Sequence, residues 1–363
     1  MIEKMNAIFG NKPYTIAGPC SAESWEQIYS TVKSLVANGI SVIRAGVWKP
    51  RTRPNQFEGK GEEALKWLQQ IKKEFDVKIA TEVASTEHVE LALKYEIDIM
   101  WLGARTTVNP FVVQEIANSL KGVNNPFFIK NPINPELSLW LGAIERIAGA
   151  GIKNIGAVHR GFSSFQKTKY RNAPMWQIPL ELKSHFPEVP LLCDPSHIAG
   201  DREMIFDIAQ KALNLNYDGL MIESHYKPNN ALSDAQQQIT PDELAILLEK
   251  LKVREATSDD VLFKNHLDEL RDKVDHLDRE IIEALATRMK AVEEIGEYKK
   301  DNNVSIFQLN RWKEITETRP QWAKVFNLDP TYILDIYKFI HQESIKKQTI
   351  IFNKDNIDST PQR

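Results

Sequence analysis

The chain has 363 residues, 42% of them hydrophobic and 26% charged, which is ordinary for a globular protein and long enough for about two domains. Its 46 Lys and Arg against 49 Asp and Glu give a net charge of −3, which argues against a protein that coats nucleic acid but allows a basic pocket. Two cysteines, Cys20 and Cys193, cannot form a disulfide framework, and no apolar run approaches the ~18 residues of a membrane span or forms a leader. We therefore expect a cytoplasmic protein with neither a membrane nor a nucleic-acid partner.

Short apolar runs alternate with amphipathic stretches over the first ~250 residues, a pattern typical of parallel βαβ units. Eight such units favour a closed (β/α)8 TIM barrel over a doubly wound open sheet. We assign residues 1–252 to this barrel. The eight runs are YTIAG from Tyr14, SVIRAG from Ser41, VKIATEV from Val77, IDIMWLGA from Ile97, PFFIKN from Pro126, KNIGAVHRG from Lys153, VPLLCDPSH from Val189 and YDGLMIES from Tyr217.

The pattern changes after a predicted linker at 253–262. Apolar positions then recur at helical spacing and predict one long helix over about 263–300, a second near 309–325 and a third from Pro330 to about 350. The first helix would be roughly 57 Å long, too long to pack against a small monomeric partner. The sequence thus predicts an all-α helical domain over 263–352 and a flexible tail over 353–363.

Polar side chains follow every predicted strand. In (β/α)8 barrels the residues that carry out the chemistry lie at the C-terminal ends of the strands, so we expect these side chains to share one rim. Random surface charge would not be phased with the strands in this way. In chain order they are Cys20; Arg44, Lys49 and Arg51; Glu82; Arg105; Lys130; His159 and Arg160; Asp194 and His197; and Glu223.

Six of these residues are cations that would converge on one mouth. Converging guanidinium and ammonium groups suit phosphate and carboxylate, so a substrate with several negative charges, or two phosphorylated substrates, would match them. The alternative is that they pair with carboxylates of the rim. The six are Arg44, Lys49, Arg51, Arg105, Lys130 and Arg160.

A second group combines a thiol, an imidazole and two carboxylates: Cys20, His197, Glu223 and Asp234. This donor set is typical of a divalent transition metal, although the spacing lacks a short ligand motif. Cys193 lies inside an apolar run and is interpreted as a core residue.

The motifs AGPCSAES from Ala17, RAGVWKPRTRPNQFEGKGEE from Arg44, DPSH from Asp194 and DGLMIESH from Asp218, with ATEV and LGAR between them, resemble the compact type Iβ group of 3-deoxy-D-arabino-heptulosonate 7-phosphate (DAHP) synthases. The resemblance covers nearly all of residues 1–250. It implies condensation of phosphoenolpyruvate with erythrose 4-phosphate on a divalent ion, Mn²⁺ or a similar transition metal. It assigns the metal to Cys20, His197, Glu223 and Asp234, phosphoenolpyruvate to Arg44, Lys49, Arg105, Lys130 and Arg160, and the acceptor's phosphate to Arg51 and Thr52. Lys49, Glu82 and Lys130 are the expected catalytic residues, the last two handling protons.

One departure keeps a related enzyme open. The sequence has Lys130-Asn131-Pro132 where this group commonly has Lys-Arg-Gly. The 3-deoxy-octulosonate phosphate synthases share the barrel and much of the cation set, but usually carry Asn after the lysine that matches Lys49. Lys49-Pro50-Arg51-Thr52 therefore favours erythrose 4-phosphate as the acceptor.

Polar residues also interrupt the helical patterns of the C-terminal domain. Two of them, Arg271 and Arg288, are seventeen residues apart, roughly 26 Å along one straight helix, so a small ligand cannot touch both. If both serve one site, a second chain must supply one of them, and an interlocked homodimer, or a larger assembly, follows. The alternative is that these residues are ordinary solvent-facing charges. The set comprises Arg271, Arg288, Lys299, Arg311, Ser344 and Gln348.

The segments LDELRDKVDHLDREIIEALATRMKAVEEIGEYK and IYKFIHQESIKKQ resemble the first and third helices of an AroQ-type chorismate mutase. The resemblance implies rearrangement of chorismate to prephenate, a step that needs a fixed conformation and electrostatic complementarity but no nucleophile. It implies that Arg271 of the partner and Arg288 bind the substrate carboxylates, that Lys299 and Gln348 act catalytically at the ether oxygen, and that Gln308, Arg311 and Ser344 line the site. Family members often have an acid at the position of Gln308 and Glu at that of Trp312.

Together the two resemblances imply a bifunctional shikimate-pathway enzyme, a homodimer through the mutase helices. Because the fused helical domain is the obvious candidate for feedback control, we further expect prephenate to inhibit the barrel through it. Three alternatives stay open: a helical domain that only binds and regulates, a purely structural dimerisation element, and an octulosonate phosphate synthase.

Overall fold

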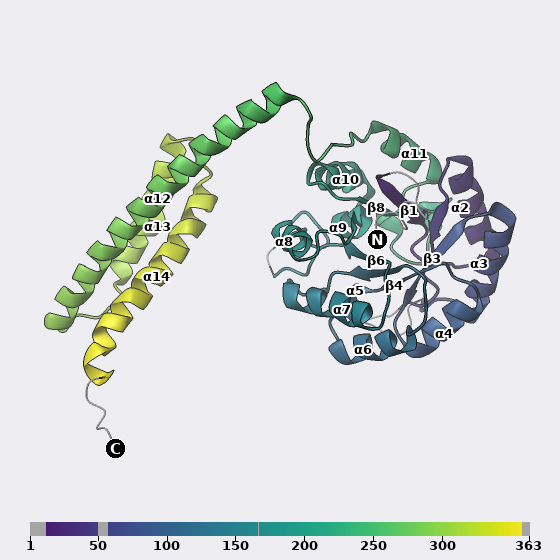
Figure 1. The fold of residues 1–363 in the computed structure, drawn as a ribbon, viewed down its shortest axis with the longest axis horizontal. Coiled ribbons are helices and arrows are strands. Elements are labelled where there is room, and N and C mark those ends of the chain that lie inside the picture. Colours follow the sequence, from purple (N-terminus) through teal and green to yellow (C-terminus); the bar gives the residue numbers. More distant parts are fainter. Residues whose placement is uncertain (1–11, 50–56, 166, 358–363) are drawn as a thin grey trace, which may run out of the picture. The chain divides into compact units, whose positions relative to one another are not determined.

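The computed structural model describes residues 12–49, 57–165 and 167–357 of the chain (Figure 1). The chain divides into two compact units, residues 1–256 and 257–363. Among the described residues, no helix has both the length and the apolar character that crossing a bilayer requires.

The first unit is a closed barrel of eight parallel strands in chain order, with β8 beside β1, which confirms the predicted fold. Each predicted apolar run contains one strand. The strands are β1 (Tyr14–Gly18), β2 (Val42–Arg44), β3 (Lys78–Val83), β4 (Ile99–Leu102), β5 (Phe127–Lys130), β6 (Ile155–His159), β7 (Leu191–Cys193) and β8 (Gly219–Glu223).

Helices surround the barrel (Figure 1), and several begin at side chains that cap free backbone N–H groups. Ser24 accepts a hydrogen bond from Gln27 N, Ser85 from His88 N, and Thr240 forms a capping box with Glu243. The helices are α2 (Trp25–Ala37), α3 (Glu62–Phe75), α4 (Thr86–Lys94), α5 (Ala104–Thr107), α6 (Pro110–Ser119), α7 (Leu137–Gly149), α8 (Gln177–His185), α9 (Pro195–Ala199), α10 (Ile205–Asn214) and α11 (Pro241–Lys250), with short 3-10 turns η1 (Arg202–Met204), η2 (Pro228–Asn230) and η3 (Ala235–Gln237).

The inside of the barrel is filled by a separate cluster of ten buried side chains, set two residues apart where a strand supplies two of them. Continuing that alternation one step toward the C-terminal ends of the strands reaches charged residues: Arg44, Glu82, Lys130, Arg160, Asp194 and Glu223. The pleat of the strands therefore directs these six side chains to the same mouth. The cluster consists of Tyr14, Ile16, Val42, Ala80, Ile99, Trp101, Phe128, Val158, Leu192 and Met221.

The second unit contains three helices, α12 (Val261–Asp301), α13 (Leu309–Val325) and α14 (Pro330–Ile357), and α14 packs against both of the others. A Cβ atom at Gly296 of α12 would come within 3.0 Å of Gln348 and Ile351, so the glycine lets α12 and α14 approach closely. Helix α14 continues to Ile357, five residues into the tail predicted at 353–363, since neither Gly nor Pro interrupts it. Residues 358–363 lie outside the described part.

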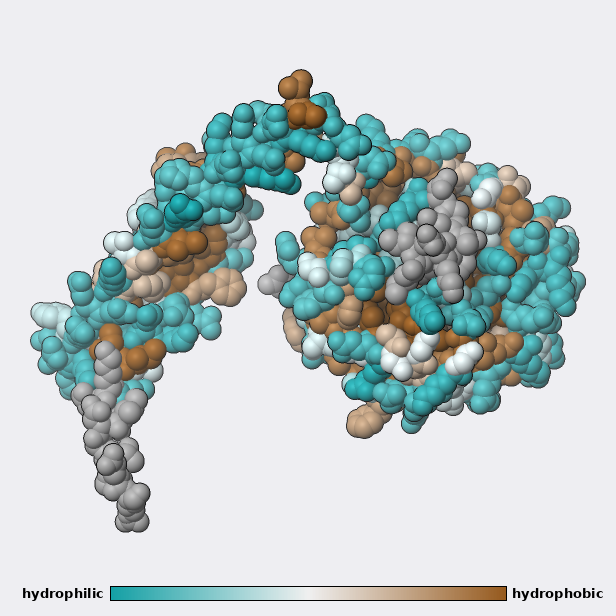
Figure 2. Space-filling view, viewed as in Figure 1, coloured by the Kyte–Doolittle hydropathy of each residue, from teal (hydrophilic) through white to brown (hydrophobic). Residues whose placement is uncertain are grey.

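The N-terminal half of α12 exposes a row of apolar side chains that are 43 to 80% accessible. Most of them follow one another at intervals of three, four or seven residues, which places them on one face of the helix. Figure 2 shows brown, apolar surface along this unit. An apolar row of this length on one helix is typical of a surface that a partner covers. The row consists of Leu262, Phe263, Leu270, Val274, Leu277, Ile281 and Ile282.

Candidate active sites

A thiol and two carboxylates meet at the C-terminal mouth of the barrel. The ligand atoms of Cys20, Glu223 and Asp234 all lie within 4.8 Å of one another. Cys20 Sγ is 3.5 Å from Asp234 Oδ2. The pairing of Gly18 with Glu223 brings the ends of β1 and β8 together, and the loops that follow these strands carry Cys20 and Asp234.

His197 belongs to the same cluster. Its Nε2 atom lies 3.8 Å from Glu223 Oε1 and 3.9 Å from Asp234 Oδ2, while its Nδ1 atom is 2.8 Å from Asp194 Oδ2. Asp194 also caps α9, which carries His197. An imidazole that presents one nitrogen to a carboxylate and the other to a group of donors has the arrangement of a metal-binding histidine. All four residues predicted as metal ligands thus lie together.

The thiol, imidazole and carboxylate groups of this cluster can together bind a cation. Burial and the Glu223 carboxylate raise the pKa of Cys20 to about 12, so the thiol keeps its proton until a cation replaces it. Burial acts to raise the pKa of Asp234, but His197 and Arg171 outweigh it and hold that carboxyl ionised. One soft sulfur, one imidazole and two carboxylates are donors that suit divalent transition metals, so these residues fit such an ion.

Three of the predicted cations surround the cluster. Arg44 is buried, and its Nη2 atom lies 3.0 Å from Glu223 Oε1. Its Nε and Nη1 atoms have no hydrogen-bond acceptor among the described residues, and such buried donors leave room for an anionic ligand. Lys130 Nζ lies 2.7 Å from Asp194 Oδ2, and Lys49 Nζ lies 3.1 Å from Cys20 Sγ. Burial lowers the pKa of Lys130 more than Asp194 raises it.

Trp101 lies between two of these cations. Arg44 and Lys130 approach its ring centroid at 5.3 and 5.6 Å, within the range of cation–π attraction. The indole Nε1 donates to Glu82 Oε2 at 3.1 Å and so orients the carboxylate expected to handle protons. We did not predict Trp101, although its place two residues beyond Ile99 on an inward-facing strand position could have indicated it.

Arg160 and Arg105 complete the described part of the cation set. Burial, together with the charges of Arg171 and Arg105, lowers the pKa of Arg160 to about 10, so three guanidinium groups lie near one another. Arg160 Nη1 donates to Asn172 Oδ1 at 2.7 Å. Arg105 is exposed in α5. Arg51 and Thr52, expected at the acceptor's phosphate, lie outside the described residues.

Asn131, the departure from the Lys-Arg-Gly motif, supports the backbone. Its Nδ2 atom donates to Pro132 O and Gly161 O at 2.8 and 2.9 Å, and its Oδ1 atom accepts from Arg160 N at 2.7 Å. The buried amide therefore joins the loops that follow β5 and β6, and its polar atoms are used within the fold.

The expectation that His159 reaches the rim is wrong. Its Nε2 atom lies 2.7 Å from Pro174 O, and Tyr217 Oη lies 3.0 Å from its Nδ1 atom, in a buried aromatic group with Phe162 and Trp176. The alternation that directs Val158 and Arg160 inward places His159 between them on the outer face of the barrel.

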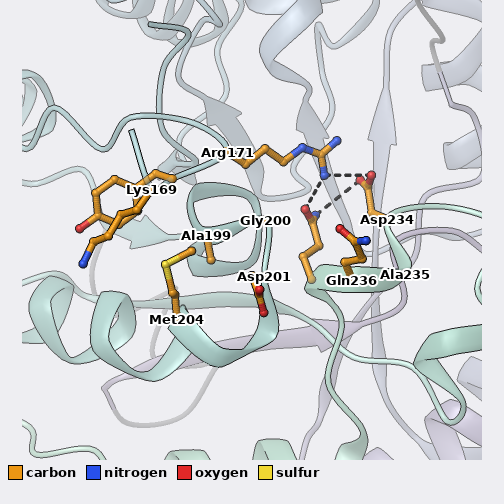
Figure 3. A pocket seen from close by; sticks show the side chains of 11 residues that line it. Lys169, Arg171, Ala199, Gly200, Asp201, Met204, Asp234, Ala235 and Gln236 are labelled. Carbon is orange, nitrogen blue, oxygen red and sulfur yellow. Dashed lines mark hydrogen bonds and ion pairs between the residues drawn. The ribbon is translucent and has the colours of Figure 1, made fainter. Parts of the chain in front are cut away.

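A cavity of about 610 Å³ opens beside Asp234, at the edge of the cluster of Cys20, His197, Glu223 and Asp234 (Figure 3). Arg171 and Gln237, neither of which we predicted, line this cavity and contact the carboxylates. Arg171 reaches the mouth from the long loop after β6, and nothing in its sequence surroundings marks it. The lining comprises Lys169, Tyr170, Arg171, Ala199, Gly200, Asp201, Met204, Asp234, Ala235, Gln236 and Gln237.

The second unit gathers four predicted residues between α12 and α14. Arg288 Nη1 donates to Ser344 Oγ at 2.8 Å, and Lys299 Nζ donates to Gln348 Oε1 at 3.2 Å. Ser344 and Gln348 are buried. Burial lowers the pKa values of Arg288 and Lys299, which is the expected effect of a site that shields cations from water.

The other three predicted residues are exposed. Arg271 contacts Asp268 at 3.4 Å on its own helix, with its side chain 67% accessible. Gln308 precedes α13, and Arg311 pairs with Glu314. The charge of Arg311 acts on Arg288, whereas Arg271 lies on the part of α12 that exposes its apolar row.

Trp312, which stands where the family often has Glu, stacks on His341 with ring centroids 4.2 Å apart and planes 18° from parallel. Burial, followed by Arg288 and Lys299, lowers the pKa of His341. A neutral aromatic pair therefore lies beside the cations at this position, in place of a carboxylate.

Two family models match the chain in succession. Residues 3–258 match the DAHP synthetase I family, and residues 270–349 match chorismate mutase type II. The first match spans the barrel and the second lies within the three-helix unit.

Individual relatives match the barrel. A phospho-2-dehydro-3-deoxyheptonate aldolase of Thermotoga maritima is 31% identical over 245 residues, covering 67% of this chain and 70% of the relative. A 2-dehydro-3-deoxyphosphooctonate aldolase of Helicobacter pylori is 31% identical over 271 residues, covering 67% of this chain and 96% of the relative. The crystal structure of the Thermotoga maritima phospho-2-dehydro-3-deoxyheptonate aldolase superposes with a TM-score of 0.58 at 28% identity, covering 65% of this chain and 67% of that one.

Proposed function

Because the chain belongs to the DAHP synthetase I family and carries a chorismate mutase type II domain C-terminal to its barrel in the sequence, we propose that it catalyses two steps of the shikimate pathway. The barrel condenses phosphoenolpyruvate with erythrose 4-phosphate to DAHP and phosphate. The helical unit rearranges chorismate to prephenate. The observation that carries the first assignment is the meeting of Cys20, His197, Glu223 and Asp234 beside buried cations.

A divalent ion on these four residues, Mn²⁺ or a similar transition metal, would act as a Lewis acid on the acceptor's aldehyde. The donor set supports it, as does the ionised Asp234 carboxylate. Asp194 Oδ2 lies 2.8 Å from Nδ1 of His197, and the Nε2 atom of the imidazole faces the cluster.

The buried cations would bind phosphoenolpyruvate. The two nitrogen atoms of Arg44 that have no acceptor among the described residues, together with Lys130 and Lys49, provide donors in a region that excludes water. Arg160 and Arg105 add charge on the other side of the mouth, next to Arg171. Asp194, Glu223 and Glu82 balance the charges of Arg44 and Lys130 in part, and a substrate with a phosphate and a carboxylate would complete the balance for the cations of this mouth.

Lys130 and Glu82 are the groups placed to move protons. As the methylene carbon of phosphoenolpyruvate attacks the aldehyde, water must capture the carbon left behind and give up a proton. Lys130, whose pKa is lowered by burial, can donate or accept near neutrality more readily than an exposed lysine. Glu82 is held by Trp101 within the same inner layer.

The acceptor is the point on which the relatives differ, since both heptonate and octonate aldolases match the barrel. We expect the full-length protein with Mn²⁺ to consume phosphoenolpyruvate with a kcat/KM for erythrose 4-phosphate at least ~100-fold above that for arabinose 5-phosphate, because a site shaped to one phosphate-to-aldehyde distance rejects the longer sugar. The loss of phosphoenolpyruvate absorbance measures the reaction rate with each of the two sugars. A higher kcat/KM for arabinose 5-phosphate would favour the octulosonate enzyme instead.

In the helical unit, Arg288 would bind a carboxylate of chorismate, and Lys299 with Gln348 would face the ether oxygen, which gains negative charge as its bond breaks. The Ser344 hydroxyl accepts a hydrogen bond from Arg288 and so orients the guanidinium group. Gln308 and Arg311 would line the entrance from α13. A regulatory module without activity is the competing assignment, because Trp312 offers no carboxylate to the substrate's hydroxyl; prephenate formation by the full chain distinguishes them.

A second copy of the chain would complete this site. Arg271 is exposed on the half of α12 that carries the apolar row, and one straight helix holds it roughly 26 Å from Arg288. Pairing two such helices would bury the row and bring the partner's arginine to the ligand. The protein would then be a homodimer, or a larger assembly built from it.

Prephenate would inhibit the barrel by binding to the helical unit. We expect Arg288→Ala to make condensation at least ~10-fold less sensitive to prephenate than in the unmodified protein, because the effector loses its guanidinium partner. The half-inhibitory concentration of prephenate measures this in the condensation assay.

Linkage supplies the control: phosphoenolpyruvate should change prephenate affinity by the same factor with which prephenate changes that of phosphoenolpyruvate. Inhibition by prephenate that is unchanged in the Arg288→Ala protein would exclude this route. We also place both activities in the cytoplasm, in line with two free cysteines.

A further inference from the structure

Arg171 and Gln237 form hydrogen bonds with Asp234 and Glu223, the two carboxylates of the proposed metal site. Arg171 Nη1 donates to Asp234 Oδ1 at 3.0 Å and to Gln237 Oε1 at a shorter distance. Gln237 Nε2 donates to Glu223 Oε2 at 2.6 Å and lies 3.5 Å from Asp234 Oδ2. Figure 3 shows the Arg171 guanidinium and Asp234 joined across the edge of the cavity.

Each carboxylate uses its two oxygens differently. Asp234 turns Oδ1 to Arg171, while its Oδ2 atom lies 3.5 Å from Cys20 Sγ and 3.9 Å from His197 Nε2. Glu223 turns Oε2 to Gln237, while its Oε1 atom lies 3.8 Å from His197 Nε2. Arg44 Nη2 also holds Glu223 Oε1 at 3.0 Å, but without Arg171 and Gln237 the Asp234 carboxylate could rotate and Glu223 Oε2 would lose its partner.

The orientation of the Gln237 amide depends on Arg171. Gln237 is buried, so solvent cannot compensate an amide that faces the wrong way. Its oxygen must face a donor, which Arg171 provides, and its NH2 group then faces Glu223 and Asp234. The reverse orientation would bring the amide oxygen against two carboxylates, which is repulsive.

The backbone fixes Arg171 relative to His197. Arg171 N donates to Ala199 O at 3.2 Å, at the end of the helix that carries His197. Gly200 has φ +72°, and a Cβ atom there would lie 2.5 Å from Arg171 Cβ, so only glycine permits this approach. The Arg171 side chain itself remains 46% accessible, which shows that core packing is not its main role.

We propose that Arg171 and Gln237 are positioning residues that set the geometry of the two carboxylate ligands before the metal binds. This inference rests on the proposed metal site of Cys20, His197, Glu223 and Asp234. Both residues hold the outward oxygens, and Arg171 acts on Glu223 only through Gln237. Partners of metal ligands typically change metal affinity 10- to 100-fold when removed.

The test is a titration of the metal-free, full-length protein with Co²⁺ alone, followed by the thiolate-to-cobalt absorption band. We expect Arg171→Ala to raise the Co²⁺ dissociation constant roughly 10- to 100-fold and Gln237→Leu to raise it by a similar factor. Arg171→Lys, which keeps the charge but places it on a shorter and more flexible stem without the planar guanidinium, should fall between Arg171→Ala and the unmodified protein. Lys169→Ala removes a neighbouring cation of the same cavity and should bind Co²⁺ within about twofold of the unmodified protein.

The double variant, Arg171→Ala with Gln237→Leu, should bind Co²⁺ about as well as the weaker single variant, since both act in one network. Far-ultraviolet circular dichroism and thermal unfolding of the same chains verify that the barrel is folded. Co²⁺ affinity unchanged in Arg171→Ala, or equally lowered in Lys169→Ala, would overturn the proposal. A band that persists in Cys20→Ser, or no Co²⁺ binding by the unmodified protein, would instead refute the metal site itself.

Discussion

Two inactive mutase variants should restore one active site when they share a dimer. Arg271→Ala and Arg288→Ala should each lower mutase kcat/KM roughly 10²- to 10³-fold, since each removes the partner of a buried carboxylate of the substrate. If one chain supplies Arg271 and the other Arg288, the mixed dimer contains one site with both arginines and one with neither. The purified mixed dimer should therefore recover about half of the wild-type mutase activity.

Both variants can be produced in one cell with different affinity tags and the mixed dimer isolated by sequential purification. Arg279→Ala removes an exposed arginine from the same half of α12 and should keep mutase activity within about twofold of the wild type. A pure mixed dimer as inactive as either variant alone would show that both arginines act within one chain, or that Arg271 does not reach the site.

Cys20→Ser should remove most of the condensation activity and leave the mutase reaction intact. Cys20 supplies the soft ligand of the cluster, and its hydroxyl replacement binds transition metals far more weakly. We expect a loss of about 10³-fold in condensation kcat at metal concentrations that saturate the unmodified protein. Phosphate release measures condensation, and prephenate formation measures the second activity on the same sample.

Cys193→Ala is the matched control, because Cys193 is equally buried but belongs to β7 and the core between strands and helices. Its condensation rate should stay within a few-fold of the unmodified rate, as expected for a small change in packing. Undiminished condensation by Cys20→Ser would mean that the thiol does not serve the reaction, whatever its distance from Asp234.

Periodicity explains why much of the barrel could be predicted. The eight apolar runs, and the charged residues two positions beyond the inward-facing Val42, Phe128 and Met221, follow from the repeat of two in a strand. The same repeat shows why the expectation for His159 was wrong, since it places that side chain on the outer face. Alternation along the strand is therefore a better guide to the mouth than adjacency to a strand end.

The rest of the site depends on contacts that no local pattern encodes. Arg171 arrives from a loop without periodicity, and Gln237 is an uncharged residue whose role appears only beside Glu223 and Arg171. Asp194 was visible at a strand end beside His197, but its other partner, Lys130, comes from a different strand. Long-range packing, rather than composition or spacing, decides these assignments.

The proposed metal site can be tested directly with crystals of the full-length protein soaked in Mn²⁺, by an anomalous difference map recorded at the manganese absorption edge. We expect one strong peak at the barrel mouth, about 2.0 to 2.6 Å from Cys20 Sγ, His197 Nε2 and a carboxylate oxygen each of Glu223 and Asp234. A peak bound by other residues, or none at this mouth under saturating Mn²⁺, would contradict the proposed chemistry of the barrel.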